Sequence, residues 1–325
     1  MTALTLQNVW KEYGNQIVIE NLSLEIAPRS FVALVGPSGC GKSTLLRLLL
    51  GQERATRGTI LLDGAPLPDE PGPDRGVVYQ RYSVFPHLTV LGNVMLGPEL
   101  QSGRVSGRSF GAARRALIAV AEQMIADVGL AGSENKYPAQ LSGGMQQRLA
   151  LAQALMMKPR VLLLDEPFGA LDPGIRTDIH HLMKRLWNER PMTVVMVTHD
   201  LREAFTLGTR VVALGRTRNR PEEADRYGAQ VTNDIVIWPP RVAGGRTLFD
   251  SEYALGWDDP TLQAVTSGRP ATSGDLRCTS TAPPNRSTQI ASAILNINAW
   301  GLNPHLVCCP WPARAPHRTS TGLRS

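Results

Sequence analysis

Hydrophobic residues follow two different patterns along this chain, and each pattern predicts a different kind of β-strand. Apolar and polar residues alternate over residues 4–6 and 22–26, and Gly14 and Asn15 form a candidate turn between them. This period of two predicts half-buried antiparallel strands. Continuous apolar runs, which are typical of strands buried on both faces of a parallel sheet, occupy residues 31–35, 161–164 and 193–197.

Segments with helical periodicity alternate with these strands. Four segments combine an apolar face with a stop signal: residues 42–50, 111–128, 142–157 and 175–187. Gly51 and Gly129 close the first two, and Lys158–Pro159 stops the third. The alternation predicts an α/β fold in which helices cover a parallel sheet, with an antiparallel lobe in front and a helix-rich insertion at about residues 85–158.

The composition changes near residue 240. Beyond it there is no lysine and no acidic residue after Asp275, and Ser, Thr, Pro and Arg are frequent. Such a sequence buries too little apolar surface to offset chain entropy. We therefore predict a folded domain over residues 1–240 and a low-complexity, mostly disordered tail over residues 241–325. Two explanations of the tail stay open: a natural regulatory or docking extension, or out-of-frame translation of a GC-rich gene.

Charge and cysteine content exclude some classes of protein. The 34 Lys and Arg exceed the 28 Asp and Glu by a formal charge of only +6, which is too weak to suggest a nucleic-acid partner. The four cysteines are too unevenly placed for a disulfide framework or a metal site. No apolar stretch reaches the roughly 18 residues of a membrane span, and no signal peptide is evident, so we expect a cytosolic protein.

A glycine-rich loop follows the predicted strand 31–35 and opens the predicted helix 42–50. Its residues are Gly36, Pro37, Ser38, Gly39, Cys40, Gly41, Lys42 and Ser43, followed by Thr44. In this context the loop predicts a nucleoside triphosphate, because backbone N–H groups and the positive helix end converge on phosphate oxygens. Lys42 supplies a mobile cation, Ser43 offers a hydroxyl to Mg²⁺, and Cys40 fills a variable position.

Two acidic residues, Asp165 and Glu166, stand at the end of the predicted strand 161–164. Burying carboxylates is costly unless a metal or a reacting group uses them. We predict that Asp165 holds Mg²⁺, directly or through water, and that Glu166 polarises the attacking water in a phosphoryl transfer. Tyr13, just past the first strand, offers an aromatic face on which adenine can stack.

A second glycine-rich turn, Leu-Ser-Gly-Gly-Met-Gln-Gln-Arg over residues 141–148, opens its own helix. Ser142 is a favourable N-cap, and Gly143 and Gly144 expose backbone donors, so the turn is a second candidate anion site. Because it belongs to the insertion, it cannot easily serve the nucleotide held by Lys42. We predict a head-to-tail dimer in which each turn, with Gln146 among its nucleotide-binding residues, closes over the ATP of the other copy.

Over residues 1–220 these motifs, in this order and spacing, resemble the ATP-binding subunits of ABC transporters. The resemblance implies the P-loop ABC ATPase fold, with a RecA-like parallel-sheet core, an N-terminal antiparallel lobe and a helical insertion. It also implies that ATP closes the dimer and that hydrolysis opens it, which drives alternating access in two membrane subunits.

The resemblance assigns roles that the residues alone leave open. His199 becomes the switch histidine that contacts the γ-phosphate and works with Glu166. Gln80, otherwise a surface glutamine, becomes a catalytic sensor that contacts Mg²⁺-bound or attacking water. Asp172 becomes a residue that crosses the dimer interface, and residues 81–95 become the contact with a membrane permease.

Within the family, residues 80–90 resemble the group that serves bacterial nitrate, sulfonate and taurine importers. This implies a peripheral subunit on the cytoplasmic face of the inner membrane, which acts on permease subunits and, indirectly, on a periplasmic substrate-binding protein. Two alternatives stay open. A soluble ABC ATPase acting on DNA or ribosomes usually carries coiled-coil insertions, zinc cysteines or a second cassette, and a P-loop kinase needs an acceptor site in place of the second glycine-rich turn.

Overall fold

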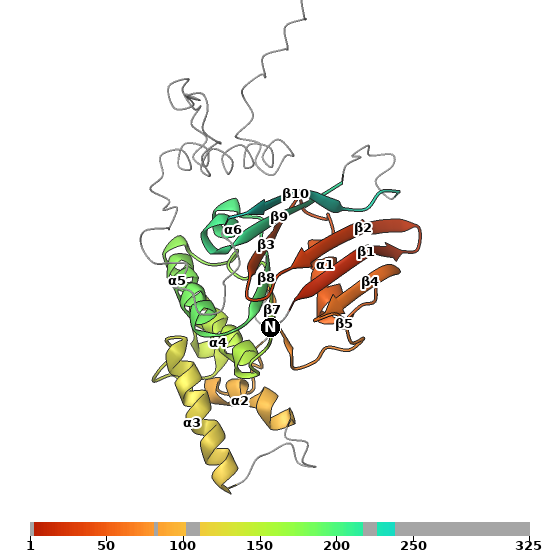
Figure 1. The fold of residues 1–325 in the computed structure, drawn as a ribbon. Coiled ribbons are helices and arrows are strands. Elements are labelled where there is room, and N and C mark those ends of the chain that lie inside the picture. The colour runs from red at the N-terminus through yellow and green to blue at the C-terminus, as the bar shows by residue number, and fades with distance from the viewer. Residues whose placement is uncertain (1–2, 81–83, 102–110, 217–225, 238–325) are drawn as a thin grey trace, which may run out of the picture. The chain divides into compact units, whose positions relative to one another are not determined.

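A computed structural model describes residues 3–80, 84–101, 111–216 and 226–237 (Figure 1). All of them lie in Met1–Ala254, the first of the two units into which the chain divides. The tail expected over residues 241–325 lies outside the described residues, as do residues 81–83 of the expected permease contact. The domain boundary at residue 240 stays a prediction.

The main sheet has six strands in the order β10-β9-β3-β8-β7-β6. They are β3 (Phe31–Val35), β6 (Arg75–Val78), β7 (Val161–Asp165), β8 (Thr193–Val197), β9 (Arg210–Gly215) and β10 (Gln230–Val236). Neighbours from β6 to β9 pair in parallel, and β10 runs antiparallel to β9. Every residue of β3 and β8 is buried, which confirms that the continuous apolar runs are strands covered on both faces.

A second sheet is antiparallel and has the strand order β2-β1-β4-β5. Its strands are β1 (Leu4–Tyr13), β2 (Gln16–Ile26), β4 (Arg57–Leu62) and β5 (Ala65–Pro66). Leu4 pairs with Ile26, and Gly14 and Asn15 form the turn, as predicted. Helix α1 (Lys42–Leu50) shares one hydrophobic core with both sheets and lies between them (Figure 1).

The remaining helices lie largely outside this core. They are α2 (Val90–Gln101), α3 (Gly111–Asp127), α4 (Gly143–Met156), α5 (Pro173–Glu189) and α6 (Leu201–Leu207), with a short 3-10 turn at Pro138–Gln140. Helices α2, α3 and α4 pack against one another, and α4 also contacts α5 and β6. All four helices predicted from the sequence form, and their ends fall within about two residues of the prediction, which is the usual uncertainty of helix ends.

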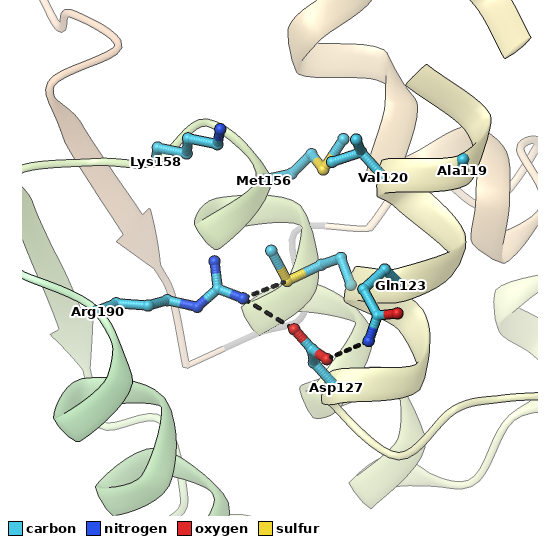
Figure 2. A pocket seen from close by; sticks show the side chains of 8 residues that line it. Ala119, Val120, Gln123, Asp127, Met156, Lys158 and Arg190 are labelled. Atoms are coloured by element: carbon cyan, nitrogen blue, oxygen red, sulfur yellow. Dashed lines mark hydrogen bonds and ion pairs between the residues drawn. The ribbon is translucent and has the colours of Figure 1, made fainter. Parts of the chain in front are cut away.

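A polar contact joins α3 to the end of α5 (Figure 2). Arg190 donates from Nη2 to Asp127 Oδ2 over 3.0 Å, and the same nitrogen lies 3.8 Å from the sulfur of Met124. Gln123 donates to the other oxygen of Asp127 over 2.8 Å. A surface pocket at this junction is lined by these side chains together with Ala119, Val120, Met156 and Lys158. The contact fixes the helical insertion against the helix that covers the main sheet.

Asn93 of α2 holds the loop that precedes this helix. Its side chain is fully buried; Oδ1 accepts the Phe85 N–H over 2.7 Å, and Nδ2 lies 3.1 Å, 3.1 Å and 2.9 Å from the carbonyl oxygens of Phe85, Leu88 and Thr89. One carboxamide therefore satisfies several backbone groups of a loop that lies inside the expected permease contact. The sequence analysis did not identify this residue.

We predict that Asn93→Ala lowers the free energy of unfolding by roughly 1 to 3 kcal/mol, because the half-buried Phe85 N–H and Leu88 carbonyl lose their side-chain partner. Urea denaturation followed by circular dichroism measures the change. Asn135→Ala is the matched control, since Asn135 is exposed. An unfolding midpoint for Asn93→Ala equal to that of the control would contradict the structural role of this carboxamide.

Candidate active site

The residues predicted to bind the phosphates and the metal and to catalyse hydrolysis meet at one edge of the main sheet. The loop with Lys42 follows β3, Asp165 and Glu166 end β7, His199 follows β8 and Gln80 follows β6. Because β3, β8, β7 and β6 are parallel neighbours, their carboxyl ends lie at the same edge, where open α/β sheets bind their ligands. The sheet thus brings together residues that are up to about 160 positions apart in the sequence.

The ammonium group of Lys42 is buried beneath the glycine-rich loop. Lys42 is 6% exposed, and its Nζ donates to the carbonyl oxygens of Gly36 and Pro37 over 2.8 Å and 2.9 Å. Within the described residues it has no ion pair. A buried charge held only by carbonyl groups is short of a counter-anion, so the position favours an anionic ligand.

The backbone of this loop leaves room for such a ligand. Gly39 and Gly41 have φ angles of 76° and 94°, a left-handed conformation that glycine adopts without steric cost. A Cβ atom on Gly39 would meet no atom within 4 Å, whereas one on Gly36 would lie 2.3 Å from the Leu214 carbonyl oxygen. Gly39 and Ser38 are exposed at the start of α1, so the loop fits a phosphate group at a helix N-terminus.

Cys40 lies on the inner side of the same loop. It is 3% exposed, and burial raises the pKa of its thiol although the nearby Lys42 charge opposes this effect. A thiol with a raised pKa is a poor nucleophile. The environment of Cys40 agrees with the expectation that it fills space in the loop.

Oxygen atoms suited to a divalent cation lie beside the loop. The Ser43 hydroxyl donates to Asp165 Oδ1 over 3.2 Å. Burial raises the pKa of the Asp165 carboxyl, the Ser43 hydrogen bond opposes this, and the negative charge of Glu166 adds to it. Hydroxyl and carboxylate oxygens are the ligands that Mg²⁺ prefers, and a cation would offset the burial of Asp165. These residues fit the ion.

This cation site would be incomplete without the nucleotide. Among the residues that the structure describes, no group of three or more His, Cys, Asp or Glu side chains stands ready for a metal. Mg²⁺ keeps about six oxygen ligands and commonly takes some from phosphate and water. Metal and nucleotide are therefore expected to bind together.

Glu166, His199 and Gln80 form one cluster. Glu166 Oε2 lies 3.3 Å from His199 Nδ1 and accepts from Gln80 Nε2 over 3.4 Å. Glu166 has a φ of 45°, a costly conformation for a residue with a side chain, and its N–H donates to the Val197 carbonyl over 3.0 Å. The His199 side chain is 59% exposed, so the cluster opens to solvent where a substrate would approach.

A buried carboxylate that the sequence analysis missed supports the loop with His199. Glu203 of α6 is 3% exposed, and its Oε2 accepts the Thr198 hydroxyl over 2.7 Å. Thr198 Oγ1 also accepts the N–H of Asp200 over 3.0 Å. Thr198 and Asp200, the residues on either side of His199, are therefore both held by hydrogen bonds of the Thr198 hydroxyl group.

Arg176 of α5 connects this loop with the turn that carries Asp172. Its Nη1 lies 3.3 Å from Asp200 Oδ2, its Nε lies 3.7 Å from Glu203 Oε1, and its Nη2 donates to the Leu171 carbonyl over 3.1 Å. Asp172 is the exposed N-cap of α5 and makes no side-chain capping bond. The charged network thus sets the positions of two loops that come from different parts of the chain.

The Glu203 carboxyl has a lowered pKa. Burial alone would raise it, but the Thr198 hydrogen bond and the nearby His180 and Arg176 outweigh burial. His180 Nε2 is 3.7 Å from Glu203 Oε1, which is longer than a hydrogen bond. A glutamate with a pKa lowered on folding stabilises the fold above its unfolded-state pKa, and this stability is lost as the pH falls through the folded-state pKa.

We predict that Glu203→Gln lowers the free energy of unfolding at neutral pH by roughly 1.5 to 3 kcal/mol, because charge-assisted contacts to a buried group are lost. The difference from the unsubstituted protein should shrink as the pH falls below about 4.3, the usual pKa of glutamate. Thermal denaturation between neutral and acid pH checks this, with the exposed Glu122→Gln as control. A difference that is independent of pH would show that the charge of Glu203 contributes nothing.

The second glycine-rich turn caps α4 as predicted. Ser142 Oγ accepts the N–H of Met145 over 3.4 Å. A Cβ atom on Gly144 would lie 2.4 Å from Ile175 Cγ2, so this glycine also allows α4 to approach the start of α5. Gln146 also holds the segment that precedes α4, because its Nε2 donates to the carbonyl oxygens of Pro138 and Leu141 over 2.9 Å and 3.3 Å. Its contact with a nucleotide stays a prediction.

Tyr13 ends β1 and is 41% exposed. The ammonium group of Lys11 lies 4.8 Å from the centre of its ring, and its hydroxyl donates to Glu53. The ring is therefore held in place and still presents surface to solvent, which agrees with the predicted stacking platform for adenine.

Among the described residues, no helix is both long and apolar enough to cross a membrane.

The fold and the site define a class of protein. A glycine-rich loop between a buried strand and a helix, a buried lysine, and acidic residues at the end of a neighbouring strand are the parts of a P-loop nucleoside triphosphatase.

Comparisons with known proteins identify the family. The sequence model of the ABC transporter family matches residues 19–169. The aliphatic sulfonates import ATP-binding protein of Burkholderia ambifaria is 45% identical over 262 residues, which cover 78% of this chain and 76% of the relative. An uncharacterised ABC transporter ATP-binding protein of Methanocaldococcus jannaschii is 42% identical over 219 residues, which cover 67% and 78%. The chain belongs to the ATP-binding subunits of ABC transporters.

A solved structure supports the same fold. The dimeric post-hydrolysis state of the ATP-binding cassette MJ0796 bound to ADP and phosphate superimposes with a TM-score of 0.59 and 31% identity, covering 73% of this chain and 99% of that chain. With the family, this confirms the RecA-like sheet with an antiparallel lobe and a helical insertion. The chain is an ATP-hydrolysing transporter subunit.

Proposed function

We propose that this chain energises a bacterial importer of small sulfur-containing anions, with an aliphatic sulfonate as the favoured cargo. The observation that carries this proposal is the 45% identity to a sulfonate importer subunit over 262 residues, well beyond the matched family segment. A sulfate/thiosulfate import ATP-binding protein of Gloeobacter violaceus is 42% identical over 218 residues, which cover 61% of that relative. These relatives favour a sulfur oxyanion over nitrate within the group expected from the sequence.

In this proposal the glycine-rich loop binds the β- and γ-phosphates of ATP. Lys42 leaves the two carbonyl groups that hold it and turns to the phosphate oxygens, which supply the missing counter-charge. The residues proposed to surround the phosphates are Gly36, Pro37, Ser38, Gly39, Cys40, Gly41, Lys42, Ser43 and Thr44. Tyr13 stacks the adenine, for which about 1 to 3 kcal/mol is typical of aromatic stacking on a base.

Hydrolysis is proposed to rely on Glu166, which orients and polarises the attacking water. His199 and Gln80 already contact this carboxylate, so they hold it and sense the γ-phosphate. Ser43 and Asp165, with Gln80 through water, would hold Mg²⁺, which when bound neutralises phosphate charge. Catalysis then consists of positioning and charge stabilisation.

A second copy of the chain is proposed to complete each site. Ser142, Gly143 and Gly144, with Gln146, would contact the ATP held by the other copy, and Asp172 would cross the interface. Two exposed features support this: Ser142 and Gly143 at the start of α4, and Asp172, whose carboxylate makes no capping bond to α5. The related cassette forms a dimer, and two-fold symmetry gives two equivalent sites.

The proposed membrane partner is a permease that contacts residues 81–95. Phe85, 39% exposed, belongs to this segment, and Asn93 holds the loop around it. The subunit would act as a peripheral protein on the cytoplasmic face of the inner membrane, and a periplasmic binding protein would deliver the anion to the permease. The relatives named above serve transporters, which favours this proposal over a soluble ATPase acting on DNA or ribosomes.

We predict that Glu166→Gln reduces ATP turnover about 10²- to 10³-fold, the usual effect of removing one preorganised electrostatic group. Because ATP then persists, the variant should run as a dimer in size-exclusion chromatography with Mg-ATP and as a monomer with ADP. Glu122→Gln, an exposed control, should behave like the unsubstituted protein. A Glu166→Gln protein that stays monomeric in saturating Mg-ATP, even with its permease present, would refute the shared site.

The cargo is tested in proteoliposomes that contain the permease and the binding protein. We predict that an aliphatic sulfonate stimulates ATP hydrolysis severalfold more than nitrate, because the binding protein must close on the correct anion before the permease shifts the cassettes. Phe85→Ser should abolish this stimulation, whereas Leu100→Ser, an exposed position outside residues 81–95, should retain it. Stimulation by nitrate alone would overturn the sulfonate assignment.

A further inference from the structure

The side chain of Glu53 makes three polar contacts, and Glu53 belongs to none of the sequence motifs described above. Its Oε2 lies 3.0 Å from Lys11 Nζ and accepts the Tyr13 hydroxyl, and its Oε1 lies 2.8 Å from Arg47 Nε. The side chain is 22% exposed. Burial alone would raise the pKa of this carboxyl, but the contacts with Tyr13, Lys11 and Arg47 together lower it. Glu53 is therefore held as a carboxylate by partners from β1 and α1.

Glu53 and Lys11 both restrain the ring of Tyr13. Glu53 accepts its hydroxyl, and the Lys11 ammonium covers one face of the ring, 4.8 Å from its centre. Lys11 is itself fixed, because it also donates to the Arg54 carbonyl over 3.0 Å. A base can then stack only on the remaining ring surface. Since the ring is already ordered, stacking costs less conformational entropy than it would on a freely rotating side chain.

The third partner reaches the glycine-rich loop. Arg47 Nη2 donates to Thr44 Oγ1 over 3.2 Å, and Thr44 follows Ser43 in the first turn of α1. Glu53 therefore links the ring at the end of β1 to the helix that presents the phosphate-binding groups. Tyr13 and Glu53 are 40 residues apart in the sequence. A nucleotide can engage its base and its phosphates together only if ring and loop keep the right spacing.

We propose that Glu53 is a positioning residue for the nucleotide base: it fixes the Tyr13 ring at a set place relative to the phosphate-binding loop. The proposal rests on the stacking role proposed above for Tyr13. If this is so, Glu53 strengthens the binding of ligands that carry a base and leaves the binding of bare phosphate unchanged.

The test compares ADP with inorganic pyrophosphate, which carries two phosphates but no base. Isothermal titration calorimetry measures both ligands on the full chain for Glu53→Gln, Tyr13→Phe, the double variant and Tyr13→Ala. Glu53→Gln keeps the shape of the side chain, and Tyr13→Phe keeps the ring and removes only the hydroxyl. Asp69→Asn is the matched control, because it removes the charge of an exposed ion pair with Arg54 nearby.

We expect Glu53→Gln and Tyr13→Phe each to weaken ADP binding by about 5- to 10-fold, which lies within the range for losing one ordinary hydrogen bond. Because both substitutions weaken the contact between the Tyr13 hydroxyl and Glu53, the loss in the double variant should be smaller than the product of the two single losses. Pyrophosphate binding and the control should be unchanged. Tyr13→Phe retains the ion pairs of Glu53, so it tests the proposal even if Glu53→Gln folds poorly.

Three results would overturn the proposal in different ways. If Tyr13→Ala weakens ADP binding but Tyr13→Phe and Glu53→Gln do not, the ring stacks the base without help from Glu53, and only this inference fails. If Tyr13→Ala binds ADP normally, the stacking role itself fails and the inference fails with it. An equal loss for ADP and pyrophosphate in Glu53→Gln would instead assign Glu53 to the phosphate loop.

Discussion

The burial of charge at the carboxyl edge of the main sheet is the constraint on which the rest of this structure depends. Lys42 is 6% exposed and is held by two carbonyl groups, and burial raises the pKa of Asp165 close by. Each of these charges is costly to bury by itself. A triphosphate with a cation would neutralise both. The cost of burying these two charges therefore favours binding of a nucleotide together with a cation.

Networks of charged side chains behind this edge hold the loops that surround it. Arg176 and Glu203 tie the loop of His199 to the turn of Asp172. Glu53 ties Tyr13 to α1, and the neutral carboxamide of Asn93 orders the loop at Phe85. Loops need such support, because few of their backbone groups are paired within a sheet or helix. Arg176, Glu203 and Asn93 belong to helices, which are the rigid elements, and Glu53 lies just after the end of α1.

Much of the fold could be predicted from local pattern. The runs at residues 31–35 and 193–197 are strands, and α1 ends at Gly51 as expected. Four strands were not predicted, namely β4, β5, β9 and β10, and β9 and β4 were missed for different reasons. Strand β9 is a buried apolar run like the others, so the pattern was present and overlooked. In β4 the first three residues are exposed and only Ile60 and Leu62 are buried, so the strand is defined by its pairing with β1 and has little signal of its own.

The sequence by itself determined the chemical groups of the site and their order, because glycine-rich turns, strand-end acids and helix caps are encoded by residues within a few positions of one another. Only the tertiary structure decided which groups meet. Glu53 and Tyr13 are 40 positions apart, Ser43 and Asp165 are 122 apart, and Gln80 and Glu166 are 86 apart. These contacts arise from the order of strands in the sheet and from the packing of α1 between two sheets. A periodicity of two or 3.6 residues carries no information about either.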